Sequence, residues 1–181
     1  MTTNPTAEPL KLHIGGEAPK EGWKILNVQA LPHVDYLGSA TDLSVIPDGS
    51  CSHVYGSHIY EHLAYSGELG VALKEAYRVL RPGGVIMVAV PDLEVLCRLF
   101  LRPELDLEQR FFVMRMIYGG QTNAWDYHKV GFNAEILGAF LYDTGFVDVM
   151  RVPSFGLFED TSNTAFEGVP ISLNVQASKP G

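Results

Sequence analysis

Cysteine, basic charge and long apolar runs are all scarce in this sequence of 181 residues. The two cysteines, Cys51 and Cys97, lack the spacing of a metal site or a disulfide framework, so we expect a reduced, cytoplasmic protein. The first residues show neither the basic nor the apolar region of a signal peptide. The longest apolar run, at residues 85–90, is too short to cross a bilayer, so we expect no membrane partner.

Basic residues are outnumbered by acidic ones, 13 to 21, which gives a formal net charge of −8. A protein that grips a nucleic-acid backbone usually carries a basic patch. We therefore expect no large nucleic-acid partner, whereas this charge balance does not exclude a small substrate. The glycine fingerprint G-x-G-x-x-G of dinucleotide-binding proteins is also missing.

Apolar strands alternate with amphipathic helices along the chain, which predicts a doubly wound α/β sheet of parallel strands. The expected strands are 10–14, 23–28, 34–38, 52–57 and 85–90, and the expected helices are 67–80, 107–118 and 133–144. Strands at 146–152 and 171–177 have only a long loop between them, so we expect an antiparallel addition at one sheet edge. We expect one domain over residues 10–181, preceded by a loose tail at 1–9.

The stretch from His58 to His62 reads H-x-x-E-H, a spacing found in zinc hydrolases. That chemistry needs both histidines on one helix face, Glu61 as general base and a third metal ligand elsewhere. Here a strand is expected to run up to Ser57, so the motif starts at the end of a strand instead of inside a helix. A zinc hydrolase is therefore the least favoured of the functions considered.

Glycine and polar residues follow several of the expected strands. Ligands of open α/β sheets bind beyond the carboxyl ends of the strands. Gly15-Gly16, Asn27–Gln29, Ser57-His58 and Pro91-Asp92 all stand at such ends. This pattern predicts a cofactor site at that rim of the sheet.

The segments SHIYEHL (57–63) and ALKEAYRVLRPGGVIMVAVPDLE (72–94) closely resemble class I methyltransferases that use S-adenosylmethionine (SAM), in particular short bacterial ones. GFVDV (145–149) and SLNVQASKP (172–180) resemble the closing strand pair of that family. The resemblance implies a Rossmann-like sheet of order 3-2-1-4-5-7-6 with strand 7 antiparallel and a helical lid insert at about 92–133. It also implies a transferase that converts SAM to S-adenosylhomocysteine (SAH).

The same resemblance places the cofactor. It implies contacts of SAM with Gly15, Gly16, Glu17, Asn27, Gln29, Asp42, Leu43, Ser57 and His58. Two positions depart from the family pattern, because Glu17 replaces a glycine and Gln29 stands near the usual ribose-binding acid. An amide hydrogen-bonds a hydroxyl without charge assistance, a loss of about 1–2 kcal/mol. A methyltransferase-fold binding module without catalysis is therefore an alternative function.

Methyl transfer needs an aligned acceptor and often a base, for which His58, His62 and His128 are the candidate catalytic residues. Some O-methyltransferases carry E-x-x-E-H at this position and bind a divalent metal. Here His58 replaces the first Glu, while Glu61 and His62 match that pattern and His128 is a candidate further ligand. Metal-assisted O-methyl transfer is therefore a second mechanistic hypothesis.

The acceptor is expected to be a small or sugar-like molecule methylated on O or N. The candidate residues of its pocket are Tyr118, Trp125, Asp126 and Tyr127, in a polar and aromatic part of the lid insert. Residues 155–168 are expected either to close this pocket or to form a homodimer contact.

Overall fold

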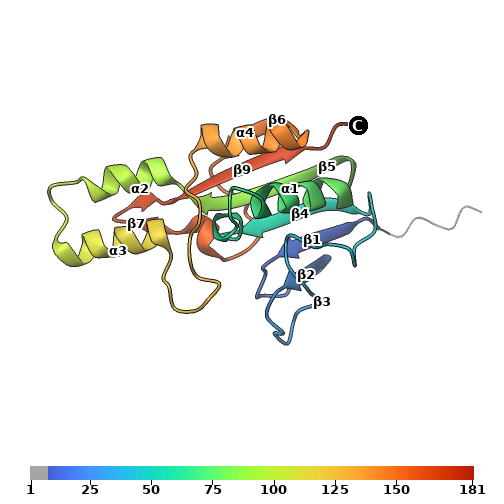
Figure 1. Ribbon diagram of the computed structural model, residues 1–181, viewed down its shortest axis with the longest axis horizontal. Helices are drawn as coiled ribbons and strands as arrows, with labels where there is room; N and C mark the ends of the chain where they lie inside the picture. The colour runs from blue at the N-terminus through green and yellow to red at the C-terminus, as the bar shows by residue number, and fades with distance from the viewer. Residues whose placement is uncertain (1–7) are drawn as a thin grey trace, which may run out of the picture.

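The structure, a computed structural model, describes residues 8–181 and is built around one seven-stranded sheet of order β3-β2-β1-β4-β5-β9-β6 (Figure 1). Its strands are β1 (Leu10–Ile14), β2 (Trp23–Asn27), β3 (Tyr36–Leu37), β4 (Cys51–Ser57), β5 (Leu80–Pro91), β6 (Val147–Val152) and β9 (Ser172–Ser178). Pairs among the first five are parallel, and β9 is antiparallel to both β5 and β6. The strand order predicted from the resemblance is confirmed; residues 1–7 of the expected tail lie outside the described residues.

The middle of the sheet follows from the apolar run of β5, in which Ile86 to Val90 are all buried. A parallel strand covered on both faces reads as a continuous apolar segment instead of an alternating one. The strand expected at 85–90 begins earlier in the structure, so that residues 81–84 also lie inside β5. There the register with β4 shifts between Cys51 and His53, and Gly83 has a positive φ of 71°.

Two helices, α1 (Glu68–Val79) and α4 (Ala134–Thr144), cover one face of the sheet. Two more, α2 (Leu93–Phe100) and α3 (Leu107–Tyr118), form a hairpin that projects beyond the end of β5 (Figure 1). A capping box of Asp106 and Gln109 opens α3, and Gly119 with a φ of 86° follows its end. Among residues 8–181, no helix has both the length and the apolar character that a membrane crossing needs.

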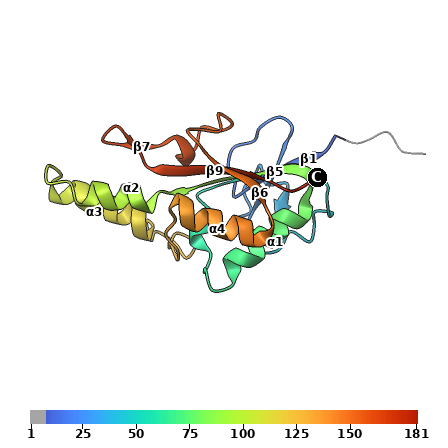
Figure 2. The same ribbon diagram turned by 90° about the horizontal axis from the view of Figure 1, so that it is seen from above.

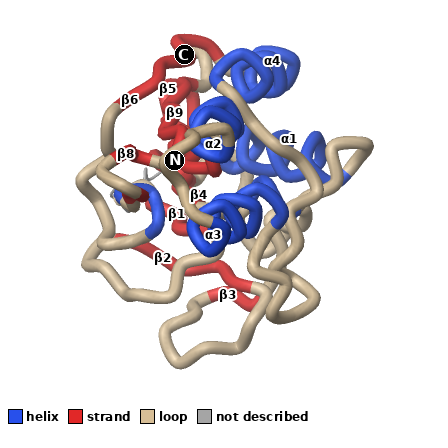
Figure 3. The backbone as a smooth tube through the Cα atoms, turned by 90° about the vertical axis from the view of Figure 1, so that its left-hand side faces the viewer, coloured by secondary structure: helices blue, strands red, loops and turns tan. Residues whose placement is uncertain are grey.

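Loops cover the opposite face, where a doubly wound sheet would carry helices (Figures 2 and 3). The link between β1 and β2 spans only residues 15–22, which leaves no room for a crossover helix. Instead, Phe155 and Phe158 pack against Trp23, Tyr55 and Met87 of the sheet. Helical cover in the described part of the chain is therefore one-sided, and an aromatic loop protects the second face.

The segment expected as a long loop at 153–170 has structure of its own. It contains one 3₁₀ turn, η2 (Thr161–Asn163), and a small hairpin of β7 (Ala165–Phe166) and β8 (Val169–Pro170). The side chain of Asp160 accepts a hydrogen bond from the hydroxyl of Tyr55 at 2.7 Å, which ties this segment to β4.

Arg78, in the last turn of α1, fastens the loop between β3 and β4. Its guanidinium donates to the carbonyls of Leu43 (2.9 Å) and Ile46 (3.1 Å) and pairs with the carboxylates of Glu75 and Asp48. Glu75 in turn accepts the backbone N–H of Leu43 at 2.8 Å. One side chain therefore fixes a loop that has no helix or strand of its own.

We expect Arg78→Gln to lower the free energy of unfolding by about 1–3 kcal/mol, because it leaves these acceptors without their donor. Urea denaturation measures the change. As a matched control, Arg98→Gln removes an exposed pair with Glu94 and should cost less than about 0.5 kcal/mol. Equal losses in the two variants would show that other contacts hold the loop.

Candidate active site

A cavity of about 370 Å³ opens beyond the carboxyl ends of β1, β2 and β4. This is the rim at which ligands of parallel α/β sheets bind, as the sequence predicted. The strand ends, the turn at 38–41, the segment 58–63 and the loop 123–129 all contribute to its lining. Segments far apart in the sequence therefore meet around one cavity.

Five of the nine residues predicted to bind the cofactor line this cavity: Gly15, Glu17, Asn27, Gln29 and His58. The structure does not bring Asp42 and Leu43 into the lining, where Ser39, Ala40 and Thr41 stand instead. Leu43 is fully buried in the core, and the carboxylate of Asp42 accepts the backbone N–H of Ser44. Gly16 and Ser57 lie beside the cavity without lining it, and the Ser57 hydroxyl is buried without a partner.

The two glycines after β1 are required by close packing. Gly15 has a φ of 75°, and a Cβ there would lie 2.0 Å from Cδ1 of Ile59. A Cβ on Gly16 would lie 2.5 Å from Nδ1 of His13. Glu17 is exposed at the edge of the cavity, so its side chain fits next to the glycine turn without a steric clash.

At the end of β2, Asn27 braces the backbone and Gln29 faces the cavity. The buried Asn27 donates from Nδ2 to the carbonyl of Gly16 (3.1 Å) and accepts the N–H of Gln29 at Oδ1 (2.9 Å). Within residues 8–181, the exposed side chain of Gln29 forms no hydrogen bond. It is therefore free to meet a ligand near the position predicted for ribose.

His13 supports the glycine turn from below and is only 5% exposed. Burial lowers its pKa from 6.5 to about 4, although Asp160 acts in the opposite direction. The unfolded chain therefore binds a proton at this position between about pH 6.5 and 4, and the folded chain does not. Stability from this group rises with pH through that window.

We expect the wild-type protein to lose about 2 kcal/mol of unfolding free energy through His13 between pH 7 and pH 5. His13→Leu should remove this part of the pH dependence. Urea denaturation of both proteins at the two pH values checks it. The same pH dependence in the variant would show that His13 is not a titrating group in this range.

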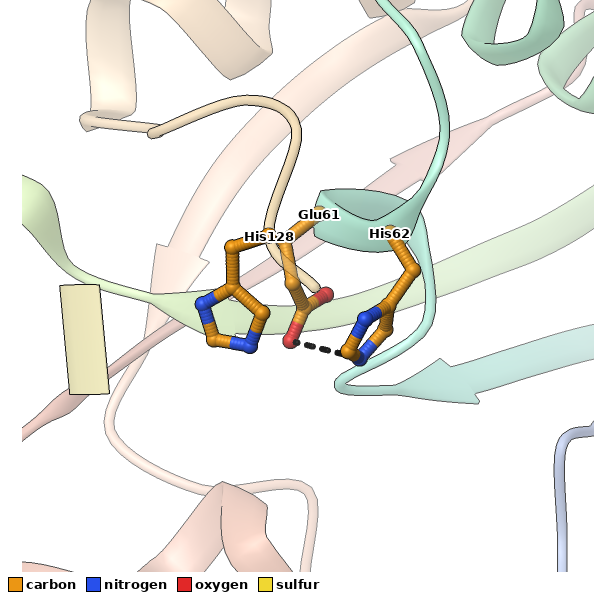
Figure 4. A group of neighbouring side chains, drawn as sticks. All are labelled: Glu61, His62 and His128. Atoms are coloured by element: carbon orange, nitrogen blue, oxygen red, sulfur yellow. Dashed lines mark ion pairs between the residues drawn. The ribbon is translucent and has the colours of Figure 1, made fainter. Parts of the chain in front are cut away.

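A cluster of three side chains lies next to this cavity: Glu61, His62 and His128 (Figure 4). One candidate ligand atom from each lies within 4.8 Å of the others. Glu61 and His62 come from the 3₁₀ turn η1 (Tyr60–His62), and His128 comes from the loop before α4. The structure thus brings together the three residues that the sequence named as metal ligands.

Backbone hydrogen bonds hold the two segments against each other. The N–H of Lys129 donates to the carbonyl of Glu61 at 2.7 Å, and the N–H of His128 donates to the carbonyl of Tyr118 at 3.2 Å. The imidazole of His128 is therefore fixed between the end of α3 and η1, and its ring centroid lies 4.8 Å from that of His62.

Glu61 is 1% exposed, and neither of its carboxylate oxygens accepts a well-formed hydrogen bond. Burial alone raises the pKa of this carboxyl, but the imidazoles of His58, His62 and His128 outweigh burial and lower it. Nδ1 of His58 lies 3.2 Å from Oε1 of Glu61, and Nε2 of His62 lies 4.0 Å from it. The carboxylate is therefore anionic and surrounded by ring nitrogens.

Backbone carbonyls set the tautomers of two histidines. Nδ1 of His62 lies 3.2 Å from the carbonyl of Tyr127, and Nδ1 of His128 lies 3.2 Å from that of Ile117. Because a carbonyl only accepts, Nδ1 carries a proton in both rings, and Nε2 is the atom that holds the lone pair whenever a ring is neutral. Burial also lowers the pKa of His128, which favours the neutral imidazole.

His58 is held differently, with a left-handed φ of 54°. Ser172 donates its hydroxyl proton to the carbonyl of Thr161 (2.9 Å), so its oxygen accepts from Nε2 of His58 (2.9 Å). The other nitrogen, Nδ1, lies 3.2 Å from Oε1 of Glu61. His58 is therefore held between Ser172 and Glu61 and positions the carboxylate.

A second cavity of about 200 Å³ adjoins the first, and His58 lines both. His128, Met116 and Arg115 also line the second cavity. The predicted acceptor residues Trp125, Asp126 and Tyr127 line the first cavity instead, and the exposed Tyr118 lines neither. Sequence reasoning missed Arg115, although its place on one face of a helix with Phe112 was a usable signal.

A family model described as a methyltransferase domain matches residues 19–88, the part of the chain that runs from β2 into β5. No curated protein matches the sequence. Solved structures do match over nearly the whole chain. A SAM-dependent methyltransferase from Archaeoglobus fulgidus is 19% identical with a TM-score of 0.59, covering 94% of this chain and 86% of that one.

Two further structures agree. A SAM-dependent methyltransferase from Thermotoga maritima is 16% identical, with a TM-score of 0.54 and coverage of 96% of this chain and 84% of that one. The 1,6-didemethyltoxoflavin N1-methyltransferase of Burkholderia thailandensis, solved with its substrate and SAH, is 15% identical, with a TM-score of 0.56 and coverage of 96% and 72%.

The chain has the class I methyltransferase fold. The resemblance predicted from the sequence is thereby confirmed at the level of the fold, including the inserted antiparallel β9. In this methyltransferase fold, the first cavity lies over the ends of β1, β2 and β4, and the second lies across His58 towards the α2–α3 hairpin.

Proposed function

We propose that this protein is a SAM-dependent methyltransferase that methylates an oxygen or nitrogen of a small acceptor. The observation that carries the proposal is the pair of cavities that share His58, one at the rim of the sheet and one beside the histidine cluster. A methyl donor and an acceptor need two adjoining sites of this kind, because the transfer is an in-line displacement.

The first cavity suits SAM. Gly15 lines this cavity at the end of β1, and the free amide of Gln29 suits a ribose hydroxyl. Glu17, Glu68 and Asp126 in the lining outnumber Lys129, an acidic balance that favours the cationic sulfonium. When bound, SAM would supply the electrophilic methyl group for the reaction.

We expect SAM and SAH to bind to the protein in calorimetry, and Gln29→Glu to strengthen SAM binding about tenfold. A carboxylate accepts the ribose hydroxyls with charge assistance, which is worth about 1–2 kcal/mol over an amide. Gln121→Glu adds the same charge on an exposed loop outside both cavities and should leave the affinity unchanged. Absence of binding at millimolar SAM and SAH would favour the non-catalytic binding module.

A specific observation favours the metal-assisted form of the reaction. The buried carboxylate of Glu61 accepts no well-formed hydrogen bond, and the Nε2 atoms of His62 and His128 converge on it (Figure 4). Histidine ligands of metals usually donate their other N–H to a carbonyl or carboxylate, as both rings do here. These residues fit a divalent cation, which would lower the pKa of an acceptor hydroxyl.

We expect protein purified without a histidine tag to bind Co²⁺ through Glu61, His62 and His128, with visible absorption bands that report the ligands. Two imidazoles favour a transition metal over Mg²⁺. His128→Gln should weaken Co²⁺ binding at least tenfold, about 1.4 kcal/mol. His33→Gln, which changes an exposed histidine outside the cluster, should leave the bands and affinity intact.

Unchanged Co²⁺ binding in His128→Gln, or no bands in the wild-type protein, would sink the metal hypothesis. In that case the same Nε2 atoms remain candidate bases for a metal-free transfer. The SAM calorimetry is a separate test, because neither Glu61 nor His128 lines the first cavity.

A further inference from the structure

The second cavity continues outward along α3. Phe112 and Arg115 line the cavity beside His58 and also a neighbouring hollow of about 330 Å³ with Phe111 and Phe166. Phe112 and Arg115 are three residues apart on α3, so they share one face of the helix. The two hollows share these two side chains and are together called the α3 groove below, with His58 at one end and Phe111 at the other.

The walls of the α3 groove are held in place by specific contacts. The rings of Phe112 on α3 and Phe166 on β7 lie with their centroids 5.4 Å apart. Nε2 of Gln109 donates to Oε1 of Glu167 at 3.0 Å, which ties α3 to the hairpin of β7 and β8. Val113 and Ile171 belong to the buried cluster under these walls. The groove is therefore a built feature between two fastened elements.

The guanidinium of Arg115 provides a positive charge in the α3 groove, whose lining also includes phenylalanine side chains. In the part of the chain that the structure describes, the ion-paired arginines are Arg78, Arg98, Arg102 and Arg151. Arg115 is not among them. Asp126 lies across Gly120 from it, but its carboxylate already accepts the N–H groups of Gly120 and Thr122 and the Thr122 hydroxyl.

A guanidinium without a carboxylate partner is suited to bind a planar carboxylate through two parallel hydrogen bonds. The aromatic side chains beside it provide flat apolar surface for a ring. At the outer end of the groove, Asp106 and Glu108 add negative charge. That charge opposes a second anionic group and so disfavours nucleotides and other polyanions.

We propose that the methyl acceptor is an aromatic monocarboxylate that lies in the α3 groove with its carboxylate on Arg115. Its ring packs against Phe112 and Met116, and its hydroxyl or amine points towards His58 and His128. This assignment rests on the proposed methyltransferase function and names the substrate class of that same site.

Benzoate and its uncharged analogue benzamide test the proposal as binding probes, with and without saturating SAH. Benzoate should shift the backbone amide NMR signals of Phe112 and Met116 and bind at least tenfold more tightly than benzamide. Arg115→Gln should weaken benzoate binding at least tenfold, and Arg115→Lys should lie between, because lysine keeps the charge but loses the fork. Arg98→Gln, on the exposed face of α2, should have no effect.

Equal benzoate affinity in Arg115→Gln and wild type, or equal affinity for benzoate and benzamide, would overturn the proposal. Arg115 is exposed, so its variants should keep the wild-type melting temperature and SAH affinity. Phe112→Ala provides a second check and should also weaken benzoate. If SAH does not bind but benzoate binding still depends on Arg115, the carboxylate site stands and the methyltransferase proposal fails.

Discussion

The arrangement of the site depends on one buried carboxylate. A charge as enclosed as that of Glu61 is costly unless opposite charge or ligand atoms surround it. Here the compensation comes from imidazoles on three segments: the end of β4, the turn η1 and the loop before α4. These segments cross where the rim of the sheet meets the α2–α3 hairpin. The carboxylate that must be neutralised therefore also fixes the junction of the two cavities.

His58 lies at that junction and lines both cavities. It follows directly after β4, a central strand whose end opens onto the first cavity, and its left-handed backbone turns the chain into η1. Strained backbone of this kind persists only where surrounding contacts determine it. Ser172 and Glu61 provide those contacts from opposite sides. The imidazole therefore lies between the two cavities while it orients the carboxylate.

The sequence predicts most of the strands and helices and the order of the strands in the sheet. The signals are local ones: the spacing of apolar residues and the family-like motif RVLRPGG at residues 78–84. The sequence also predicts the trio of Glu61, His62 and His128, again through a motif. The sequence-based prediction of cavity residues failed in the loop between β3 and β4, which has no helix or strand of its own. The turn at 38–41 lines the cavity in place of Asp42 and Leu43, because the side chain of Leu43 packs in the core and its carbonyl is bound by Arg78.

Long-range contacts explain the other differences. Trp125 and Tyr127 turn towards the first cavity because backbone bonds from Lys129 to Glu61 fold their loop over it, and no local pattern encodes that crossing. The cover of the second sheet face by Phe155 and Phe158 likewise depends on residues far away in the sequence. The short link at residues 15–22 is a sequence signal that no helix lies between β1 and β2.

The tautomers narrow the chemistry further. With Nδ1 of His62 and His128 donating to carbonyls, each ring offers one lone pair, at Nε2. That lone pair can bind a metal cation or take the proton from the molecule that is methylated in the proposed reaction, but it cannot do both at once. If a divalent cation were bound, Glu61 and the two Nε2 atoms would hold it, and neither ring would be free to take a proton. If no metal is present, His128 is the better base, because it lines the second cavity and burial keeps its ring neutral.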